Sequence, residues 1–253
     1  MLISAQLISK YLNLKPKTIL HIGAHLGEEY DDYKKLSWGE DLTIWIESSP
    51  ELVLQLKNKL DLTNNLVIEC TAWSQTGLKL NFNVSNNSQS SSLLDLDLHK
   101  LLYPEIFIVN TISKITQRID EILPIGFSPE FLNIDIQGAE KEALIGCGDL
   151  LRDVAYIYSE VNKVSIYRSC TLVWDLDNYL RNFGFKRVLT SWYKNHGWGD
   201  ALYVNLDKVE ISKLRILYLK YFLLIQKFNN KIHFLCRYFL NKAKITLRSL
   251  IHN

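Results

Sequence analysis

The residues of this 253-residue sequence that could do chemistry are carboxylates at the ends of apolar runs. Glu47 closes the run TIWIE, Asp135 closes FLNID and Glu160 closes YIYSE. Parallel strands end at one edge of a sheet, and open α/β sheets bind ligands there, so we expect these side chains to converge. Clustered carboxylates fit a site for a cation, a hydroxyl or a metal. A single Asp at a strand end is more often a cap or turn residue, so the interpretation depends on the group.

A turn that contains two glycines, HIGAHLGEE, follows the apolar run at residues 18–22. Gly23 and Gly27 permit a tight turn and a close backbone approach. The dinucleotide fingerprint would place a second glycine where Ala24 stands, to admit a pyrophosphate. Glu47 follows at the distance, about twenty residues, where an acid can hold a ribose. The pattern predicts an adenosine ligand without a diphosphate, and a purely structural strand-to-helix turn is the alternative.

Composition places the chain among globular proteins. Its 47% hydrophobic content is enough for a full core in one large domain or two small ones. The four cysteines form no CxxC pair and no signal peptide opens the sequence, so we expect a reduced, cytoplasmic setting. Residues 1–16 have helical spacing but are too short and polar for a membrane span, and we expect them to pack on the core as a helix.

Charge divides the chain into an acidic body and a basic tail. Residues 208–253 hold ten Lys/Arg and one Glu, whereas residues 1–207 carry a net charge of −7. An acidic body argues against nucleic acid as a partner, because phosphate backbones require clustered positive charge. It tolerates a cationic cofactor. We therefore predict a domain at 1–207 followed by a separate tail at 208–253.

The tail intersperses apolar residues with regularly spaced lysines and arginines, which predicts a basic amphipathic helix. Lys220 interrupts its longest apolar stretch, so it is not expected to span a membrane. Such a helix can lie on an anionic membrane surface, which would make the protein peripheral at the membrane. Docking on the acidic body or on the partner of a homodimer is the alternative.

Strand and helix patterns alternate along the body, which indicates an α/β fold. Ser49-Pro50-Glu51 has the residues of a helix start, and strands near 183–189 and 200–205 fit a closing antiparallel pair. The predicted strands are 18–22, 42–47, 65–70, 131–135, 154–160, 183–189 and 200–205, with helices near 28–36, 49–60, 138–151 and 172–182.

Three intervening segments complete the body. Residues 64–84 predict a strand, a turn and a second strand, and residues 105–123 a strand that leads into a short helix. The polar segment 85–92 is expected to be a mobile loop near the site, with a surface loop of no role as the alternative. The aromatic loop that contains Trp192, His196 and Trp198 could stack on a sugar or base, or could cover the core.

With these motifs in order, the chain resembles the FkbM family of S-adenosylmethionine-dependent methyltransferases from about residue 17 to residue 205. The resemblance is carried by HIGAHLGEE, IWIESSP, CTAWSQTG and FLNIDIQGAEKEALIGCG, and by the later SEVNKVSIYRSC and WGDALYVN. It implies a Rossmann-like class I methyltransferase sheet of seven mostly parallel strands, with helices on both faces and the last strand inserted antiparallel. It also implies O-methylation of a hydroxyl on a sugar, a glycan or a related small molecule.

The resemblance assigns roles to particular residues. Gly23, Ala24 and Gly27 would line the methionine part of the cofactor, and Glu47 would hold the ribose. The full set that the resemblance places at the cofactor is His21, Gly23, Ala24, His25, Gly27, Glu47, Ser48, Ala72 and Asp135, with Ala72 bordering the adenine and Asp135 and Glu160 facing the acceptor. Two positions depart from the family pattern: His21 stands where an acid is common, for which Glu28 or Glu29 could substitute, and Asn133 where lysine is common.

Methyl transfer to a hydroxyl depends mainly on a short, collinear approach, and a base that takes the proton adds to the rate. We expect Asp135 to be that base, then Glu160, with His25 and His196 behind them. The sequence lacks a dense aspartate cluster and we predict no metal, although Asp135 and Glu160 together could bind a divalent ion, as in some sugar methyltransferases.

Two other functions stay open at this point. One is an inactive cofactor-binding fold kept as a scaffold or interaction protein, which His21 and the unusual tail would fit. The other is an NAD-dependent dehydrogenase, which Ala24 disfavours.

Overall fold

The computed structural model describes residues 1–194 and 196–225. The chain divides into two units, Met1–Ile211 and Ser212–Asn253, and all helices and strands with labels belong to the first.

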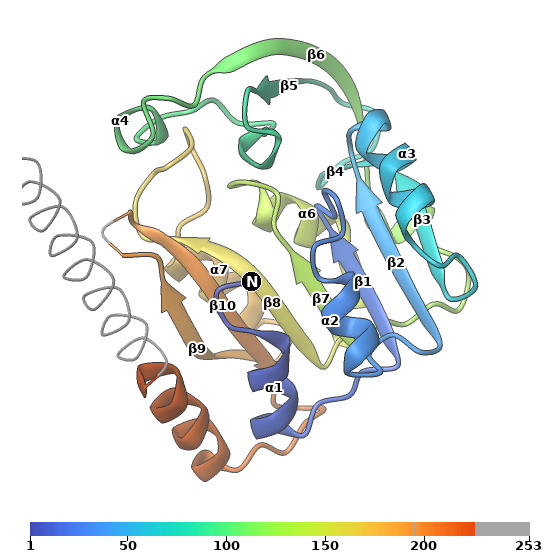
Figure 1. Ribbon diagram of the computed structural model, residues 1–253, viewed down its shortest axis with the longest axis vertical. Helices are drawn as coiled ribbons and strands as arrows, with labels where there is room; N and C mark the ends of the chain where they lie inside the picture. Colours follow the sequence, from blue (N-terminus) through green and yellow to red (C-terminus); the bar gives the residue numbers. More distant parts are fainter. Residues whose placement is uncertain (195, 226–253) are drawn as a thin grey trace, which may run out of the picture. The chain divides into compact units, whose positions relative to one another are not determined.

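A seven-stranded sheet forms the centre of the first unit, in the order β3-β2-β1-β7-β8-β10-β9 (Figure 1). Five neighbouring strands are parallel, and β10 lies between β8 and β9 and runs antiparallel to both. The predicted class I methyltransferase sheet, with its inserted antiparallel strand, is therefore confirmed. The strands are β1 (Thr18–Ile22), β2 (Leu42–Glu47), β3 (Asn65–Glu69), β7 (Phe131–Ile134), β8 (Tyr156–Asn162), β9 (Phe185–Trp192) and β10 (Trp198–Asn205).

Helices cover both faces of this sheet, with α1 and α2 on one side and α6 and α7 on the other (Figure 1). Side chains of a strand alternate between faces, so Leu20 and Ile22 of β1 join the aliphatic core that also holds Leu144 and Leu176. His21, between them, faces the opposite side. The helices are α1 (Ala5–Leu12), α2 (Tyr30–Lys35), α3 (Pro50–Lys59), α4 (His99–Leu102), α5 (Ile119–Ile122), α6 (Glu140–Gly146) and α7 (Val173–Arg181).

One predicted helix is shorter than expected. The helical pattern at 138–151 gives α6 and then a separate 3₁₀ turn, Gly148–Arg152. Gly148 has a φ of +54°, which an α-helix cannot include, and this ends the helical run.

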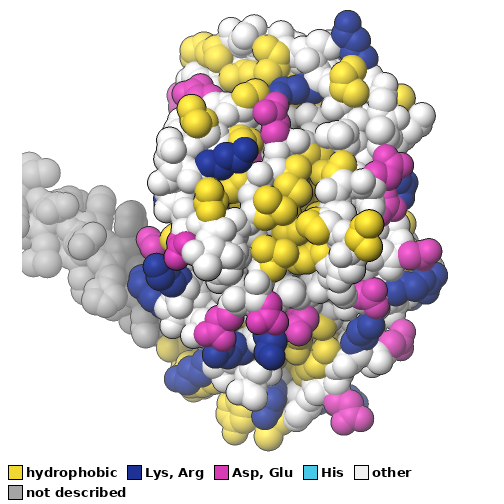
Figure 2. All heavy atoms as spheres, turned by 90° about the vertical axis from the view of Figure 1, so that its right-hand side faces the viewer, with side chains coloured by type: hydrophobic (Ala, Val, Ile, Leu, Met, Phe, Trp, Pro, Cys, Tyr) yellow, Lys and Arg dark blue, Asp and Glu magenta, His cyan; other side chains and the backbone are white. Residues whose placement is uncertain are grey.

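A smaller three-stranded sheet, in the order β4-β6-β5, arches over the carboxyl edge of the large one (Figure 1). Its strands are β4 (Thr71–Ala72), β5 (Lys79–Ser85) and β6 (Ile108–Gln117). The polar segment after β5 contains a 3₁₀ turn, Ser88–Ser90, and lies beneath this arch beside the site. Figure 2, which faces the side of α3 and β3, shows hydrophobic side chains gathered in the middle of that surface.

The second unit begins with a helix at residues 213–225. The rest of the predicted basic helical tail, residues 226–253, lies outside the described residues. Among the residues that the structure describes, no helix is both long and apolar enough to cross a membrane.

Candidate active site

Two adjoining cavities open at the carboxyl edge of the large sheet, of about 390 Å³ and about 500 Å³. We call the first the cofactor cavity and the second the acceptor cavity. The cofactor cavity lies over β1, β2 and the loops after them, and the acceptor cavity lies over β7, β8 and β10. Both are lined at their junction by the same five residues: Gly23, His25, Gln89, Asp135 and Gln137. A ligand that fills one cavity therefore meets a ligand that fills the other.

Gly23 makes the junction possible. Its φ is +82°, and a Cβ at this position would lie 1.9 Å from the carbonyl oxygen of Asp135. No side chain fits there, so glycine is required on both conformational and steric grounds. Its backbone N–H and that of Ala24 both donate to the carbonyl of Ile46 (3.0 Å each), which ties the turn to β2.

Glu47 is buried in the cofactor cavity and its carboxylate is already oriented. Oε2 accepts the backbone N–H of His25 (2.8 Å), and Oε1 accepts that of Ser49 (2.8 Å). Each carboxylate oxygen has a second lone pair, so Glu47 can still accept two ribose hydroxyls. Burial raises the pKa of Glu47, and backbone hydrogen bonds oppose that rise.

The rest of the cofactor cavity suits an adenosine. Ala72, Cys70, Leu52, Phe82 and Ile136 give it an apolar wall. Ser48 lines the same cavity, with its hydroxyl 2.7 Å from that of Thr71. An apolar slot, a glycine that permits close approach and an oriented acid fit the nucleoside part of S-adenosylmethionine.

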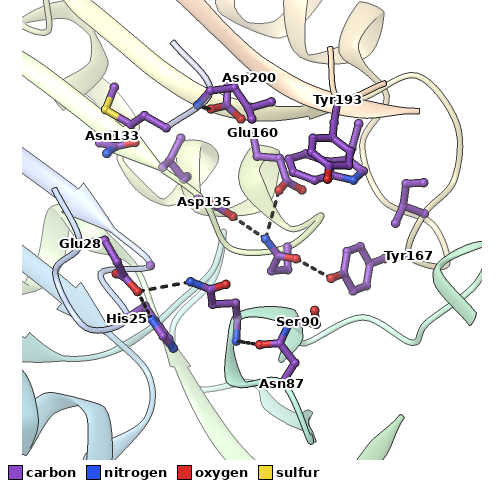
Figure 3. A pocket seen from close by; sticks show the side chains of 18 of the residues that line it. His25, Glu28, Asn87, Ser90, Asn133, Asp135, Glu160, Tyr167, Tyr193 and Asp200 are labelled. Carbon is purple, nitrogen blue, oxygen red and sulfur yellow. Dashed lines mark hydrogen bonds and ion pairs between the residues drawn. The ribbon is translucent and has the colours of Figure 1, made fainter. Parts of the chain in front are cut away.

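Carboxylates gather at the wall of the acceptor cavity, which Asp135 and Glu160 line (Figure 3). Asp135, Glu140 and Glu160 each offer an oxygen within 4.8 Å of the other two. Burial is the main cause of a raised pKa in all three: the pKa of Asp135 rises to about 6 and that of Glu140 to about 7. The pKa of Glu160 lies well above its usual range because of burial and the nearby charge of Asp135.

Gln137 connects these groups. Its amide nitrogen donates to Asp135 Oδ1 (2.6 Å) and to Glu160 Oε2 (3.1 Å), and its amide oxygen accepts the Tyr167 hydroxyl (2.5 Å). Its backbone has a φ of +57°, which is uncommon for a residue with a side chain. Glu140 holds the loop in this shape, since its Oε1 accepts the backbone N–H groups of Ile136 and Gly138.

The predicted loop at 85–92 contributes to both cavities, through Asn87, Gln89 and Ser90 on the acceptor side and Ser88, Gln89 and Ser91 on the cofactor side. His25 joins it to the glycine turn, with Nε2 2.8 Å from the hydroxyl of Ser88 and Nδ1 2.6 Å from Glu28 Oε1. The hydrogen bond to Glu28 is the main cause of a raised pKa at His25.

Several predicted residues lie apart from this centre. His21 lines the acceptor cavity rather than the cofactor cavity, and its ring stacks on Trp45 (4.8 Å between centroids) in an aromatic layer under α2. Burial lowers its pKa, so it is a neutral packing residue. Ala24 and Gly27 shape the turn, and neither is among the described residues that line the two cavities.

The aromatic loop is divided in its role. Trp198 lines the acceptor cavity, whereas Trp192 packs against the core and carries Lys163 over its ring. His196 stacks on Tyr103 (5.0 Å) behind the cavity wall, and it is not among the described residues that line either cavity.

Sequence reasoning missed Asp200, Gln137 and Tyr167. Asp200 is buried in β10 directly opposite Glu160 of β8. Its Oδ2 accepts the backbone N–H of Leu2 (2.6 Å) and the hydroxyl of Tyr158. The signal available in the sequence was an acid within an otherwise apolar strand, GDALYVN.

The sheet is mostly parallel, has helices on both faces and contains one inserted antiparallel strand. A cavity that suits a nucleoside adjoins a second cavity lined by carboxylates. Together these features are those of an α/β protein of the class I methyltransferase fold. The chain matches the family described as "Methyltransferase FkbM domain" over residues 21–187, and it belongs to this family. S-adenosylmethionine is accordingly its cofactor. A search of curated proteins found no match.

Several solved structures are similar to this chain. The FkbM methyltransferase of Methylobacillus flagellatus KT is similar, with a TM-score of 0.50 at 17% identity over 74% of this chain. The chain spans 43% of the length of that protein. A SAM-dependent methyltransferase of Aquifex aeolicus gives 0.46 at 14% identity, covering 81% of this chain and 91% of that one. The magnesium protoporphyrin IX methyltransferase of Synechocystis PCC 6803, solved with bound SAM, gives 0.45 at 13% identity, covering 79% and 75%.

Proposed function

We propose that this methyltransferase transfers the methyl group of S-adenosylmethionine to a hydroxyl of a sugar, a glycan or a related small molecule. The observation that carries the proposal is the shared wall of the two cavities at Gly23 and Asp135. Glu47 would hold such a cofactor by its ribose, and Gly23 and Asp135 would then border its methionine part. An acceptor hydroxyl above Glu160 then approaches from the other side.

S-adenosylmethionine supplies an electrophilic methyl group when bound. The chain supplies position: Glu47 accepts the ribose hydroxyls, the Gly23 turn permits close approach, and the acceptor cavity orients the incoming oxygen. The new bond joins the acceptor oxygen to the methyl carbon, and the bond between that carbon and sulfur breaks. The hydroxyl proton passes to a carboxylate at the wall of the acceptor cavity.

Asp135 is the better of the two candidate bases. Its pKa of about 6 leaves it mostly ionised at neutral pH, whereas burial and the Asp135 charge hold more of Glu160 in the protonated form. Gln137 donates to both, so it fixes their relative orientation. This supports Asp135 as proton acceptor and Glu160 as the group that orients the hydroxyl.

Calorimetric titration with S-adenosylmethionine and S-adenosylhomocysteine tests the cofactor half of the proposal. Glu47→Gln should weaken binding about 10- to 100-fold, the value of one or two hydrogen bonds to a charged group. Glu51→Gln is the matched control, because Glu51 lines the same cavity but is exposed. Equal affinity for the two variants, or no binding of either ligand at millimolar concentration, contradicts the proposal.

Methyl transfer to glycan acceptors, followed with radiolabelled cofactor, tests the acceptor half. Cofactor binding without transfer to any acceptor would instead favour the scaffold function.

We also propose that the basic C-terminal segment contacts an anionic membrane surface. In its described part, the helix at 213–225 combines Lys213, Arg215 and Lys220 with exposed Leu217 and Phe222. On an anionic membrane the basic side chains of such a helix would contact the lipid headgroups, and its apolar side chains would lie against the acyl chains beneath them.

A further inference from the structure

The acceptor cavity is strongly acidic. Five carboxylates line it, those of Glu28, Glu29, Asp135, Glu160 and Asp200, and the described residues around it include no lysine or arginine. Such a cavity repels phosphate and carboxylate groups.

Two of these five acids have a cationic neighbour. Glu28 lies 2.6 Å from His25, and Glu29 lies 3.4 Å from the amino nitrogen of Met1. The hydrogen-bond donors to the other three are neutral: the Gln137 amide for Asp135 and Glu160, and the Leu2 amide and Tyr158 hydroxyl for Asp200. The amino group of Met1 also attracts Asp200 and Asp135 at longer range. The five carboxylates therefore outnumber the cationic groups of the described lining, and Glu160 and Asp200 have no salt-bridge partner among the described residues.

Glu160 and Asp200 are placed at the same level of the sheet. They are direct cross-strand partners on the antiparallel strands β8 and β10, and both are buried. Like charges in this arrangement destabilise a sheet. A single cation between the two carboxylates would reverse the sign of that interaction.

An aromatic wall faces the pair. Tyr193 and Trp198 stack face to face (4.7 Å between centroids, 10° between planes), and Trp198 Nε1 donates to the hydroxyl of Tyr103 (3.0 Å). Figure 3 shows Tyr193 beside Glu160, with Tyr167 across the cavity. On the same wall, His99 is buried and its Nδ1 has no hydrogen-bond partner among the described residues. Aromatic faces bind the C–H face of a sugar ring and also attract ammonium groups.

We propose that the acceptor is an amino sugar, a polyol ring whose protonated amine is bound between Glu160 and Asp200 while its ring lies against Tyr193 and Trp198. This inference rests on the proposed function and names its substrate class. The sulfonium of the cofactor carries one positive charge and the protonated amine of the acceptor carries a second. Both would offset negative charge on the carboxylates of the cavity. Anionic sugars and sugar phosphates are rejected by the same charges.

The test compares matched methyl glycosides bound to the complex with S-adenosylhomocysteine, measured by ligand-observed NMR. Four forms are used in each of the gluco, galacto and manno series: the 2-amino, the 2-acetamido, the parent 2-hydroxy and the uronate. The amino form of at least one series should bind about tenfold tighter than its acetamido and neutral counterparts, as one charge-assisted contact predicts, and the uronate weakest.

Variants locate the amine. Glu160→Gln and Asp200→Asn should each reduce the preference for the amino form to less than about threefold. Asp97→Asn, an exposed acid away from the lining, should leave it unchanged. Affinity for S-adenosylhomocysteine should be the same in all variants, which separates a wrong acceptor class from a failure of the proposed function.

The inference is overturned if neutral or anionic glycosides bind as tightly as amino ones. It is also overturned if no glycoside binds at about 100 mM, which corresponds to about 1.4 kcal/mol of binding free energy, while S-adenosylhomocysteine does. Binding of millimolar Mg²⁺ or Ca²⁺ that abolishes the amine preference would assign the carboxylates to a metal instead.

Discussion

Replacing Glu160 by Gln should stabilise the free protein at neutral and alkaline pH. Glu160 is buried, and its carboxylate lies within 4.8 Å of those of Asp135 and Glu140. Two unit charges at that separation repel by about 3 kcal/mol at an effective dielectric constant of about 20. Gln at position 160 removes the repulsion, and its amide oxygen can still accept the Gln137 amide.

The pH dependence of this gain identifies its cause. Folding raises the pKa of Glu160, so the folded protein favours the protonated form of this side chain. The stability that comes from this protonation is present at low pH and is lost as the pH rises through the pKa of Glu160 in the folded protein. Stability of the parent protein should therefore fall with rising pH by up to about 1.4 kcal/mol per unit for each extra proton held by the folded state. Glu160→Gln should match the parent near pH 5 and exceed it by about 2–3 kcal/mol near pH 8.

Urea unfolding of both proteins at about pH 5 and about pH 8 measures this difference. A range of about three pH units is wide enough to show how the free energy of unfolding changes with pH. Glu105→Gln is the control, because Glu105 is exposed and should change stability by less than about 0.5 kcal/mol at any pH. Two results would contradict this prediction: a stability difference that does not vary with pH, or a Glu160→Gln variant that is less stable than the parent. Either would mean that a positive charge absent from the described part of this structure stabilises the ionised Glu160.

Three further changes test the junction and the tail. Gly23→Ala should abolish cofactor binding or folding because of the 1.9 Å contact, whereas Gly77→Ala, at a similar φ of +87° with open space around it, should cost only about 1 kcal/mol in urea unfolding. Gln137→Leu removes a hydrogen bond that lowers the pKa of Asp135, so the acid limb of the pH–rate profile should move upward from about 6, and an unmoved limb would exclude Asp135 as the base. Full-length protein should float with phosphatidylserine vesicles but not with neutral ones, and loss of residues 208–253 should remove the difference; equal flotation of both proteins would contradict a membrane contact.

Most of the fold follows from local sequence. The run TILHI gives β1 within the predicted bounds, and Ser49-Pro50 caps α3 as expected, with the Ser49 hydroxyl accepting the N–H of Leu52. The antiparallel insertion of β10 was predictable from the resemblance and from the nearness of two strands. The break at Gly148 was not, because a positive φ within a helical pattern is set by the packing of Asp120 and Arg118 around it.

The site was predicted in its strand-end acids but not in its connections. Asp135 and Glu160 follow from the rule that ligands bind at carboxyl strand edges, and the structure places both in one cavity. Asp200 lies on the antiparallel strand β10, so it is at the beginning of its strand and not at the carboxyl end. The rule about carboxyl strand ends therefore does not predict it. The role of Gln137 could not be predicted from the sequence, because it depends on the positive φ of this residue. With an ordinary negative φ its side-chain amide would point elsewhere.

Departures from local rules concentrate where the two cavities meet. His25 and Gln137 are two of the five described non-glycine residues with positive φ, and both line both cavities. Next to them are the carboxylates of Asp135 and Glu160, whose shared hydrogen-bond donor is the neutral Gln137 amide. Each of these features costs stability, and none improves packing of the core. Their shared location indicates that the sequence retains them for ligands, and the cationic sulfur of the cofactor is the ligand whose charge this junction lacks.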